Sequence, residues 1–489
     1  MTRPFLLAFS ERAFKPPFTN LAFFVWLFFV WCFLFHPDSP LLLAAFWDED
    51  DYLHFVRVID WLEGQSWFDP MVYRMAPPEG VAIHYSRLAE LPLAAIMAPL
   101  HALGMEWKYA AYLAACLYPA ILFGVFLKAL LWVSQEVIDP LWSRSIAFVA
   151  LFSPYLTFHF SIGRVDHHGL AVVLVLMATG CMLRLIREPA KLVWPIGAGF
   201  FLALGQSIAL ESLLWVLGLS FWVGAYAVWG VRAYAKAGAV FGLSFYVFSH
   251  LFLALTVAPE AFFATTASAY SYLYVFMAGA IASVFLATWL LSGFSSKAVR
   301  FIGSAVMALA VGGGFFALFP EVVKGPYGGV DPALATLLFP NISEAAAKVD
   351  VVENPLRLFV LILGPLAGLL ASVCFVFRSQ GAARLRWFFF ALATGLSLGL
   401  ALYYQQRITL YAQLFSIFAL TELFRRGWLY IGKTKKGRPR FAAELGLILL
   451  VGPLLGVIAP ALMDGRRFNT GVLMFPVLAK PQTESMGHG

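Results

Sequence analysis

Long apolar runs recur along almost the whole chain and decide what it can fold into. Each run holds about 18 or more residues, which is the length that an α-helix needs to cross a bilayer. Apolar residues make up 61% of the 489 residues and charged residues only 12%, and the mean hydropathy is +0.80. A water-soluble chain of this length could not bury so much apolar surface. The sequence therefore predicts an all-α polytopic membrane protein with about thirteen transmembrane helices.

The apolar runs delimit the expected spans. They cover residues 20–35, 108–133, 143–160, 168–187, 193–209, 212–231, 237–257, 269–292, 301–319, 355–377, 385–403, 408–424 and 441–463. Residues 88–103 are also apolar but contain Pro92 and Pro99, and proline interrupts the hydrogen bonds of a helix. We predict that this segment forms a helix leaning against the membrane face and not a full span.

The distribution of charge predicts the topology. Basic residues gather in the turns at 184–191, 232–236, 297–300, 378–386 and 425–440, whereas acids gather in 48–63 and 331–353. Because cytoplasmic loops are enriched in lysine and arginine, the amino terminus is predicted to be cytoplasmic. The loops 36–107 and 320–354 are then periplasmic, as is the carboxyl terminus. Counting 88–103 as a span would place the basic turns up to residue 300 outside, which this asymmetry excludes.

The same features predict the domain organisation. We expect residues 1–489 to form a single transmembrane domain in the inner (plasma) membrane, with no separate soluble domain. The net charge of +7 is a topology signal, since no soluble basic face with aromatic residues is present to bind nucleic acid. The four cysteines lie inside apolar runs, and their spacing matches neither a disulfide set nor a zinc site.

Polar side chains crowd the exit of the first expected span. Residues 46–57 read Phe-Trp-Asp-Glu-Asp-Asp-Tyr-Leu-His-Phe-Val-Arg and bring four acids, Tyr52 and His54 to the membrane surface. Carboxylates near a bilayer are costly unless they bind something, so Asp50 and its neighbours are candidate functional residues. A solvated loop with several acids is the alternative interpretation.

A second polar motif, Gly163-Arg164-Val165-Asp166-His167-His168, lies between the third and fourth expected spans. Asp166 and His168 are two residues apart in a turn, which lets both side chains converge on one cation. Carboxylate plus imidazole suits Mn²⁺ or Zn²⁺, and Mg²⁺ where carboxylates dominate. The alternative is a helix N-cap at Asp166 beside interfacial histidines.

Two further motifs fall on the same predicted face. Pro340-Asn341-Ile342-Ser343-Glu344 follows a glycine-rich turn at 325–329, which makes the loop 320–354 a candidate lid. Gln405-Gln406-Arg407 joins two spans and is flanked by tyrosines, among them Tyr411. The guanidinium of Arg407 could grip a phosphate, although an arginine at a helix end often only snorkels to the interface.

In this order, the four motifs resemble those of the catalytic subunit of oligosaccharyltransferase, a glycosyltransferase of the GT-C fold. The family's Asp-x-Tyr-x-His-like motif after the first span reads Asp50-Asp51-Tyr52-Leu53-His54 here. Its Phe-Asp-Pro and Pro-x-Gly passage corresponds to residues 68–80, which are followed by His84-Tyr85-Ser86-Arg87-Leu88. Its Gly-x-x-Asp-x-Asp/Glu motif corresponds to 163–168, its loop motif ending in glutamate to 341–344, and its arginine with a tyrosine four residues on to Arg407 and Tyr411. The resemblance covers essentially the whole chain.

The resemblance implies roles for individual residues. Asp50, Asp166 and His168 would hold a divalent cation, Mn²⁺ or Mg²⁺. Asp50, Glu344 and Arg407 would be catalytic, and the donor or acceptor would be bound by Tyr52, His54, His84, Arg407 and Tyr411. Two departures from the family are visible. His168 stands where a carboxylate is usual, and the Trp-Trp-Asp-Tyr-Gly motif of the domain that recognises a protein acceptor is missing.

The expected activity is metal-dependent transfer of a sugar or glycan from a polyprenyl-phosphate or -pyrophosphate donor to an acceptor on the periplasmic side. Because the bilayer already orients a lipid whereas short loops offer little surface to a peptide, the predicted acceptor is a glycolipid or polysaccharide. Oligosaccharyl transfer to protein is the first alternative. A lipid or solute transporter is the second, but the two similar halves and midplane charges of transporters are not evident in this sequence.

Overall fold

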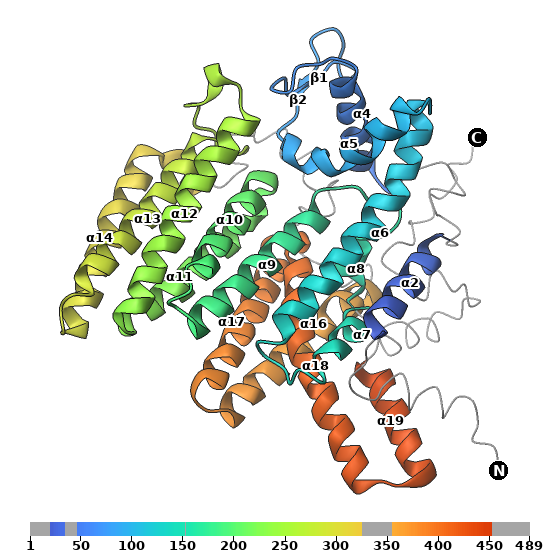
Figure 1. Ribbon diagram of the computed structural model, residues 1–489, viewed down its shortest axis with the longest axis vertical. Coiled ribbons are helices and arrows are strands. Elements are labelled where there is room, and N and C mark those ends of the chain that lie inside the picture. Colours follow the sequence, from blue (N-terminus) through green and yellow to red (C-terminus); the bar gives the residue numbers. More distant parts are fainter. Residues whose placement is uncertain (1–19, 35–45, 152, 325–354, 452–489) are drawn as a thin grey trace, which may run out of the picture. The chain divides into compact units, whose positions relative to one another are not determined.

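The computed structural model describes residues 20–34, 46–151, 153–324 and 355–451. These residues are mainly helical, and their strands form one two-stranded antiparallel hairpin, β1 (Met71–Val72) with β2 (Val81–Ala82) (Figure 1). Eight helices in the described part are long and apolar enough to cross a bilayer. The chain is thus an all-α polytopic membrane protein, whereas the prediction of about thirteen spans is not confirmed.

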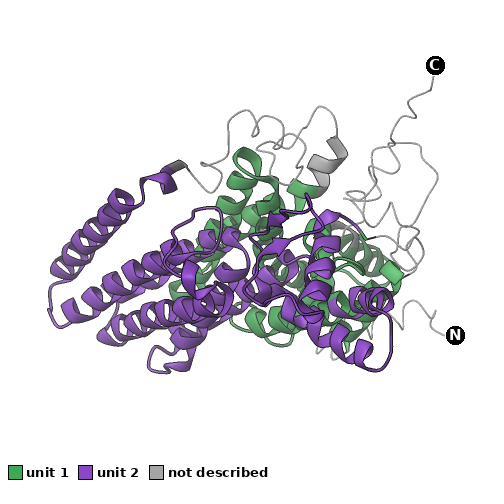
Figure 2. Cartoon of the chain, turned by 90° about the horizontal axis from the view of Figure 1, so that it is seen from above, with its two compact units in different colours: residues 1–46, 119–164, 338–489 green, residues 47–118, 165–337 purple. Residues whose placement is uncertain are grey.

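The chain divides into two compact units, each made of separate stretches of sequence (Figure 2). The first unit contains residues 1–46, 119–164 and 338–489, and the second contains 47–118 and 165–337. One long helix, α6 (Trp107–Ser134), begins in the second unit and continues into the first, because the division falls at Pro119.

The first unit is built around the long helix α18. Its other elements are α2 (Leu21–Leu34), η1 (Ser143–Ser145), α7 (Ile146–Ala150), α8 (Pro154–Phe158), α16 (Pro355–Arg378), α17 (Gly381–Tyr403), η5 (Gln406–Ile408), α18 itself (Thr409–Thr434) and α19 (Gly437–Val451). Helices α16 and α17 pack against each other and against α18. Phe390 of α17 and Phe418 of α18 are fully buried at this contact, with ring centroids 4.5 Å apart.

One expected span in the first unit differs from the structure. Residues 143–160, predicted as one helix, form the three short pieces η1, α7 and α8. Pro154 begins α8, because proline has no N–H to donate and disfavours the helical conformation in the residue before it; Ser153 has φ −109° and ψ 75°. The side chain of Gln413 on α18 accepts a hydrogen bond from the N–H of Leu156 at 2.9 Å, which satisfies a donor that a helix start leaves without a partner.

The second unit contains six of the thirteen expected spans, from 168–187 to 301–319. Its elements are α4 (Glu49–Leu62), the β1–β2 hairpin, α5 (Arg87–Ala102), α9 (His168–Arg187), α10 (Val193–Ile208), η2 (Leu210–Ser212), α11 (Leu213–Trp229), α12 (Arg232–Thr256), η3 (Pro259–Ala261), α13 (Tyr272–Leu291), α14 (Lys297–Leu318) and η4 (Pro320–Lys324). Neighbouring helices pack in the order α9, α10, α12, α13 and α14, and α11 packs against α12. Helix α5 confirms the helix expected at 88–103; it packs against α4 and is not among the eight candidate spans.

Small residues allow these helices to approach closely. A Cβ added to Gly199 of α10 would lie 2.7 Å from the backbone nitrogen of Phe245 and 2.8 Å from the Cβ of Ser244, both on α12. A Cβ added to Gly242 of α12 would lie 3.0 Å from the Cα of Ala282 on α13. Helices in lipid associate largely through such close packing, because lipid tails provide no hydrophobic driving force. The glycines therefore set the spacing of α10, α12 and α13.

This packing gives a first prediction. Gly199→Leu should lower the thermal stability of the purified protein, because the new side chain meets the α12 backbone, and overpacking costs about 1–3 kcal/mol. Gly218→Leu on α11 is the matched control, since a Cβ there has no neighbour within 4 Å. The measurement is the unfolding temperature of both variants in the same detergent. Equal unfolding temperatures would show that the α10–α12 contact is not tight.

Candidate functional site

The acid-rich stretch after the first span forms the beginning of α4. Asp48 is the N-cap, and one of its carboxylate oxygens accepts hydrogen bonds from the N–H groups of Asp50 and Asp51 at 3.0 and 3.3 Å. Asp51 completes a capping box, since its carboxylate accepts the N–H of Asp48 at 3.3 Å. Carboxylates in the first turn are also favoured by the helix dipole. Asp48 and Asp51 therefore have a structural role, and Glu49 and Asp50 remain for other contacts.

Asp51 also joins the first motif to the second. Its Oδ1 accepts hydrogen bonds from the backbone N–H groups of Val165 at 2.8 Å and of Asp166 at 3.1 Å, and the residue is fully buried. Burial raises the pKa of Asp51 well above its usual range, and the nearby charge of Asp166 raises it further, while the two backbone donors act in the opposite direction. The loop that carries Asp166 is thus fixed to the first turn of α4.

His54, Asp166 and His167 form a buried group of potential metal ligands. One ligand atom from each of the three residues lies within 4.8 Å of the others. The Nδ1 atom of His167 is 2.7 Å from Oδ1 of Asp166. His54 is 1% exposed, and its Nε2 makes no hydrogen bond in the described part of the chain. A buried nitrogen without a partner is unusual, and a bound cation would satisfy it, so these donors fit a divalent metal.

His168 lies beside this group and is held by a carboxylate of its own. Its Nε2 is 3.5 Å from Oδ2 of Asp166, and its Nδ1 is 3.0 Å from Oε1 of Glu211. Glu211 belongs to η2, between α10 and α11. A second carboxylate that contacts the far nitrogen of a histidine commonly orients that histidine toward a metal. The arrangement therefore leaves Nε2 of His168 facing Asp166.

His54 has a similar support on α5. Its Nδ1 is 3.5 Å from Oε1 of Glu90, which also lies 3.1 Å from Nε of Arg57, while Oε2 of Glu90 accepts a hydrogen bond from Arg87 at 3.1 Å. All four side chains are at most 3% exposed. Arg87 further donates to the backbone carbonyls of Arg57 at 2.8 Å and of Asp69 at 3.0 Å. One glutamate and two arginines thus lock α4, α5 and the turn before β1 together.

Tyr85 connects Asp50 to the histidines. Its hydroxyl donates a hydrogen bond to Oδ1 of Asp50 at 2.8 Å, and its ring lies 5.2 Å from that of His54 and 5.0 Å from that of His167, measured between centroids. The exposed ring of His84 meets Tyr85 edge-on, with centroids 4.6 Å apart. Asp50 is therefore next to the ligand group through Tyr85, although it is not one of the three residues in it.

The sequence-predicted residues fall into three sets. Asp50, Tyr52 and His54 on α4, His84 before α5, and Asp166 and His168 before α9 all belong to the second unit. Tyr52 is 44% exposed. Arg407 in η5 and the buried Tyr411 on α18 belong to the first unit. Glu344 lies outside the described residues.

Four residues of the site were not singled out from the sequence: Asp51, Glu90, His167 and Glu211. The sequence around two of them, Glu211 and Glu90, contains a pattern that could have identified them. Glu211 is an isolated acid between long apolar runs, which is a mark of function in a membrane protein. Glu90 follows Arg87 at helical spacing for an ion pair. Asp51 and His167 lie inside the quoted motifs, and only the structure separates them from their neighbours Asp50 and His168.

The fold of this chain is similar to that of archaeal oligosaccharyltransferases. Oligosaccharyltransferase AglB from Archaeoglobus fulgidus, in complex with an inhibitory peptide and a dolichol-phosphate, matches 94% of this chain with a TM-score of 0.68 and 16% identity. The enzyme of that organism tethered with an acceptor peptide matches 96% with a TM-score of 0.65 and 15% identity. Its complex with Zn and sulfate matches 89% with a TM-score of 0.59 and 16% identity.

These matches cover only part of the solved structures. The chain spans about half the length of the solved structures, 56% of the first two and 52% of the third. No protein-family model matches the chain, and no curated protein matches it by sequence. The chain therefore has the GT-C fold of the membrane part of oligosaccharyltransferase, as the order of its motifs predicts.

The Glu90 network gives a second prediction. Glu90→Ala should destabilise the protein by about 3–5 kcal/mol, because it leaves two buried arginines without their carboxylate. Asp60→Ala is the control, since Asp60 pairs with Arg74, which is 61% exposed, and solvent screens such a pair. Thermal unfolding of both variants in detergent checks the difference. A smaller effect for Glu90 than for Asp60 would contradict the ionic role of the network.

Proposed function

We propose that this chain is a membrane glycosyltransferase that transfers a sugar or glycan from a polyprenyl-phosphate or -pyrophosphate donor to an acceptor. The fold supports this proposal, since the solved structures that share it are oligosaccharyltransferases, one of them with a dolichol-phosphate. We further propose that the protein is a multi-pass protein of the plasma membrane with its active site on the periplasmic face, as the charge asymmetry predicts.

The buried group of His54, Asp166 and His167, with His168 beside it, carries the proposal. Burying so many polar groups together is costly, so a cation is the simplest reason for the arrangement. Imidazole with carboxylate favours Mn²⁺ or Zn²⁺ over Mg²⁺, which prefers oxygen ligands; a similar structure contains Zn and sulfate. When bound, the divalent cation would act as a Lewis acid on the phosphate that leaves the sugar.

The side chains of the chain would do the remaining work. Asp166 and the histidines hold the cation, and Glu90 and Glu211 keep two of those histidines oriented. Asp50, fixed by the hydroxyl of Tyr85, is placed to complete the ligand set or to orient the acceptor. A carboxylate of this kind serves as general base where the acceptor is a hydroxyl. We propose the same acceptor role for Glu344.

Arg407 has a separate role in this proposal. A guanidinium beside a phosphate stabilises the negative charge that develops as the sugar leaves, and its planar donors match two phosphate oxygens at once. Tyr411, one helical turn further on, packs in the buried part of α18. We propose that Arg407 contacts the donor phosphate and that Tyr411 positions the start of α18. The exposed Tyr52 and His84 would contact the donor or acceptor, whereas the buried His54, also predicted from sequence to do so, would instead be a metal ligand.

We propose a glycolipid or polysaccharide as the acceptor. In the described residues, the polar part around α4 and α5 amounts to the β1–β2 hairpin and short turns, and a flexible peptide needs an extensive folded surface to bind. A lipid-linked acceptor is already concentrated and oriented by the bilayer. The alternative is a protein acceptor, which one of the similar structures favours because it contains an acceptor peptide.

The third prediction concerns the metal. The purified full-length chain should bind one Mn²⁺, measured by titration calorimetry, and Asp166→Asn should abolish this binding because it removes the central carboxylate. Glu211→Ala should weaken Mn²⁺ binding about 10–100-fold by freeing His168 to rotate. Glu260→Ala is the control, since Glu260 is exposed and lies in η3.

The histidine variants separate the two possible ligand sets. Loss of Mn²⁺ binding in His168→Ala but not in His167→Ala would support the ligand set predicted from sequence, which contains His168. Loss in His167→Ala but not in His168→Ala would support the group that contains His167. Size-exclusion profiles confirm that each variant is folded. Unchanged Mn²⁺ affinity in Asp166→Asn would refute the metal site.

The fourth prediction concerns the reaction. Deleting the gene should remove a sugar from envelope glycolipids or polysaccharides and leave protein glycans unchanged. Arg407→Lys should not restore the missing sugar in a deletion strain, because an ammonium cannot reproduce the two-pronged contact of a guanidinium with phosphate. Lys433→Arg, in the last turn of α18, is the control and should restore it. Lost protein glycans beside unchanged lipids and polysaccharides would favour the protein acceptor instead.

A further inference from the structure

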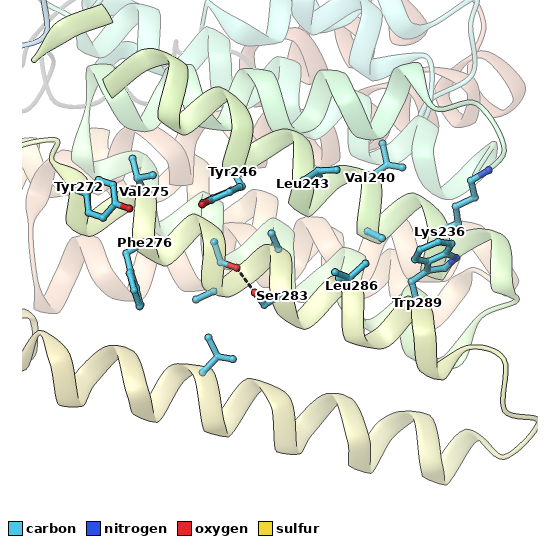
Figure 3. A pocket seen from close by; sticks show the side chains of 15 residues that line it. Lys236, Val240, Leu243, Tyr246, Tyr272, Val275, Phe276, Ser283, Leu286 and Trp289 are labelled. Carbon is cyan, nitrogen blue, oxygen red and sulfur yellow. Dashed lines mark hydrogen bonds between the residues drawn. The ribbon is translucent and has the colours of Figure 1, made fainter. Parts of the chain in front are cut away.

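A groove lies in the second unit, away from the candidate metal ligands. A groove of about 620 Å³ runs along α12 and α13 and is closed on one side by Val311 of α14. Figure 3 shows Tyr272 and Phe276 at one end and Lys236 and Trp289 at the other. Cavities of this volume hold small organic ligands, and the lining is apolar apart from these terminal groups, Tyr246 and Ser283.

The groove exists because α14 packs loosely. Only 11% of the apolar window of α14 is buried. Helices α13 and α14 meet at one end through the hydroxyls of Thr288 and Ser304, 2.9 Å apart, and at the other through the rings of Phe276 and Phe315. Between these contacts, small residues such as Gly279 and Ala280 line α13 and leave space. Because α12, α13 and α14 are all candidate spans, this space faces the hydrocarbon of the membrane.

Charge is distributed unevenly along the groove. From residue 212 to residue 320 the sequence contains one acid, Glu260, which lies after α12, and four basic residues, Arg232, Lys236, Lys297 and Arg300. All four basic residues lie at the start of α12 or the start of α14. Helices α12, α13 and α14 follow one another in antiparallel order, so these starts share one end of the groove, where Lys236 and Trp289 lie.

Within the described residues, one of these four basic side chains makes a hydrogen bond and the other three make none. Arg300 is buried and donates a hydrogen bond to the carbonyl of Gly230 at 3.0 Å, which fixes the α11–α12 turn to α14. Arg232, Lys236 and Lys297 are exposed. No carboxylate in the described residues pairs with any of them. Their positive charge is therefore available to an anion at the membrane surface.

The basic end lies far from the candidate metal ligands. The turn before β1 contacts the other end of α12, where the indole of Trp67 donates a hydrogen bond to the carbonyl of Leu255 at 2.5 Å. Lys236 and Leu255 are separated by about 28 Å along the helix axis. A donor whose phosphate lies at the metal site cannot also contact Lys236 with that phosphate. A ligand that contacts Lys236 in this groove would therefore be a different molecule from a donor bound at the metal site.

We propose that this groove binds an anionic phospholipid. One acyl chain fills the apolar space between α12, α13 and α14, and the headgroup phosphate contacts Lys236 and Lys297. Tryptophan and lysine together are typical of the level of lipid headgroups, and basic pockets between transmembrane helices recognise anionic headgroups. Arg232 adds long-range attraction at the same level.

The test uses the purified full-length protein and native mass spectrometry. Phosphatidylglycerol and phosphatidylcholine with identical acyl chains are added separately, so that only the headgroup charge differs. Phosphatidylglycerol should bind more tightly, and Lys236→Gln and Lys297→Gln should each weaken its binding about fivefold, the value expected for one basic residue at an anionic surface. Phosphatidylcholine binding should change little. Lys433→Gln, an exposed lysine of the first unit, is the charge-matched control.

Two further arms test the groove itself and the nature of the anion. Ala280→Phe places a ring in the groove and should lower the binding of both lipids. Excess inorganic phosphate should not displace phosphatidylglycerol, because the acyl chain supplies much of the binding. Equal binding of the two lipids, an equal loss in Lys433→Gln, unchanged binding in Ala280→Phe, or displacement by phosphate would each overturn the proposal. If one lysine variant fails to fold, phosphatidylglycerol binding to the other variant alone tests the headgroup contact.

Discussion

One buried carboxylate holds the two motifs of the candidate site in register. Asp51 accepts two backbone N–H groups from the loop before α9 and also completes the cap of α4. A fully buried acid is stable only when such donors offset the loss of water. His54, one turn further along α4, and Asp166, whose own N–H is one of the donors, consequently have fixed relative positions. The ligand group follows from this single contact.

The other charges around the site are also held in pairs. Glu90, which contacts His54, is paired with Arg57 and Arg87. Glu211 contacts His168. Both carboxylates come from helical elements and not from flexible turns. Sites supported in this way keep their geometry without a ligand. The pairing explains how so many polar groups persist next to membrane helices, where an unpaired charge would be expelled.

The sequence predicts the class and the order of the helices well, because the bilayer imposes a length on every span. It also predicts α9 from His168 to Arg187 with both ends correct. It fails at 143–160, where apolar composition hides the helix start at Pro154. The ligand set shows another limit. Spacing identifies Asp166 and His168, but only the backbone conformation decides which imidazole faces which carboxylate and brings His167 into the group. Glu90 and Glu211 act across helix contacts that no local pattern reveals.

The balance of charge at the site bears on its chemistry. Glu90 is neutralised by Arg57 and Arg87, so these three groups leave one positive charge in excess, and it is buried. Asp50, Asp166 and Glu211 bring three further carboxylates to the site, in contact with Tyr85 and the two adjacent histidines. A lipid phosphate approaching these carboxylates would be repelled, since like charges at short range in a poorly solvated site interact strongly. A divalent cation bound between the carboxylates would turn this repulsion into an attraction for the phosphate. The proposed phosphate chemistry and the proposed metal therefore depend on each other, and either one alone would be difficult to reconcile with this set of side chains.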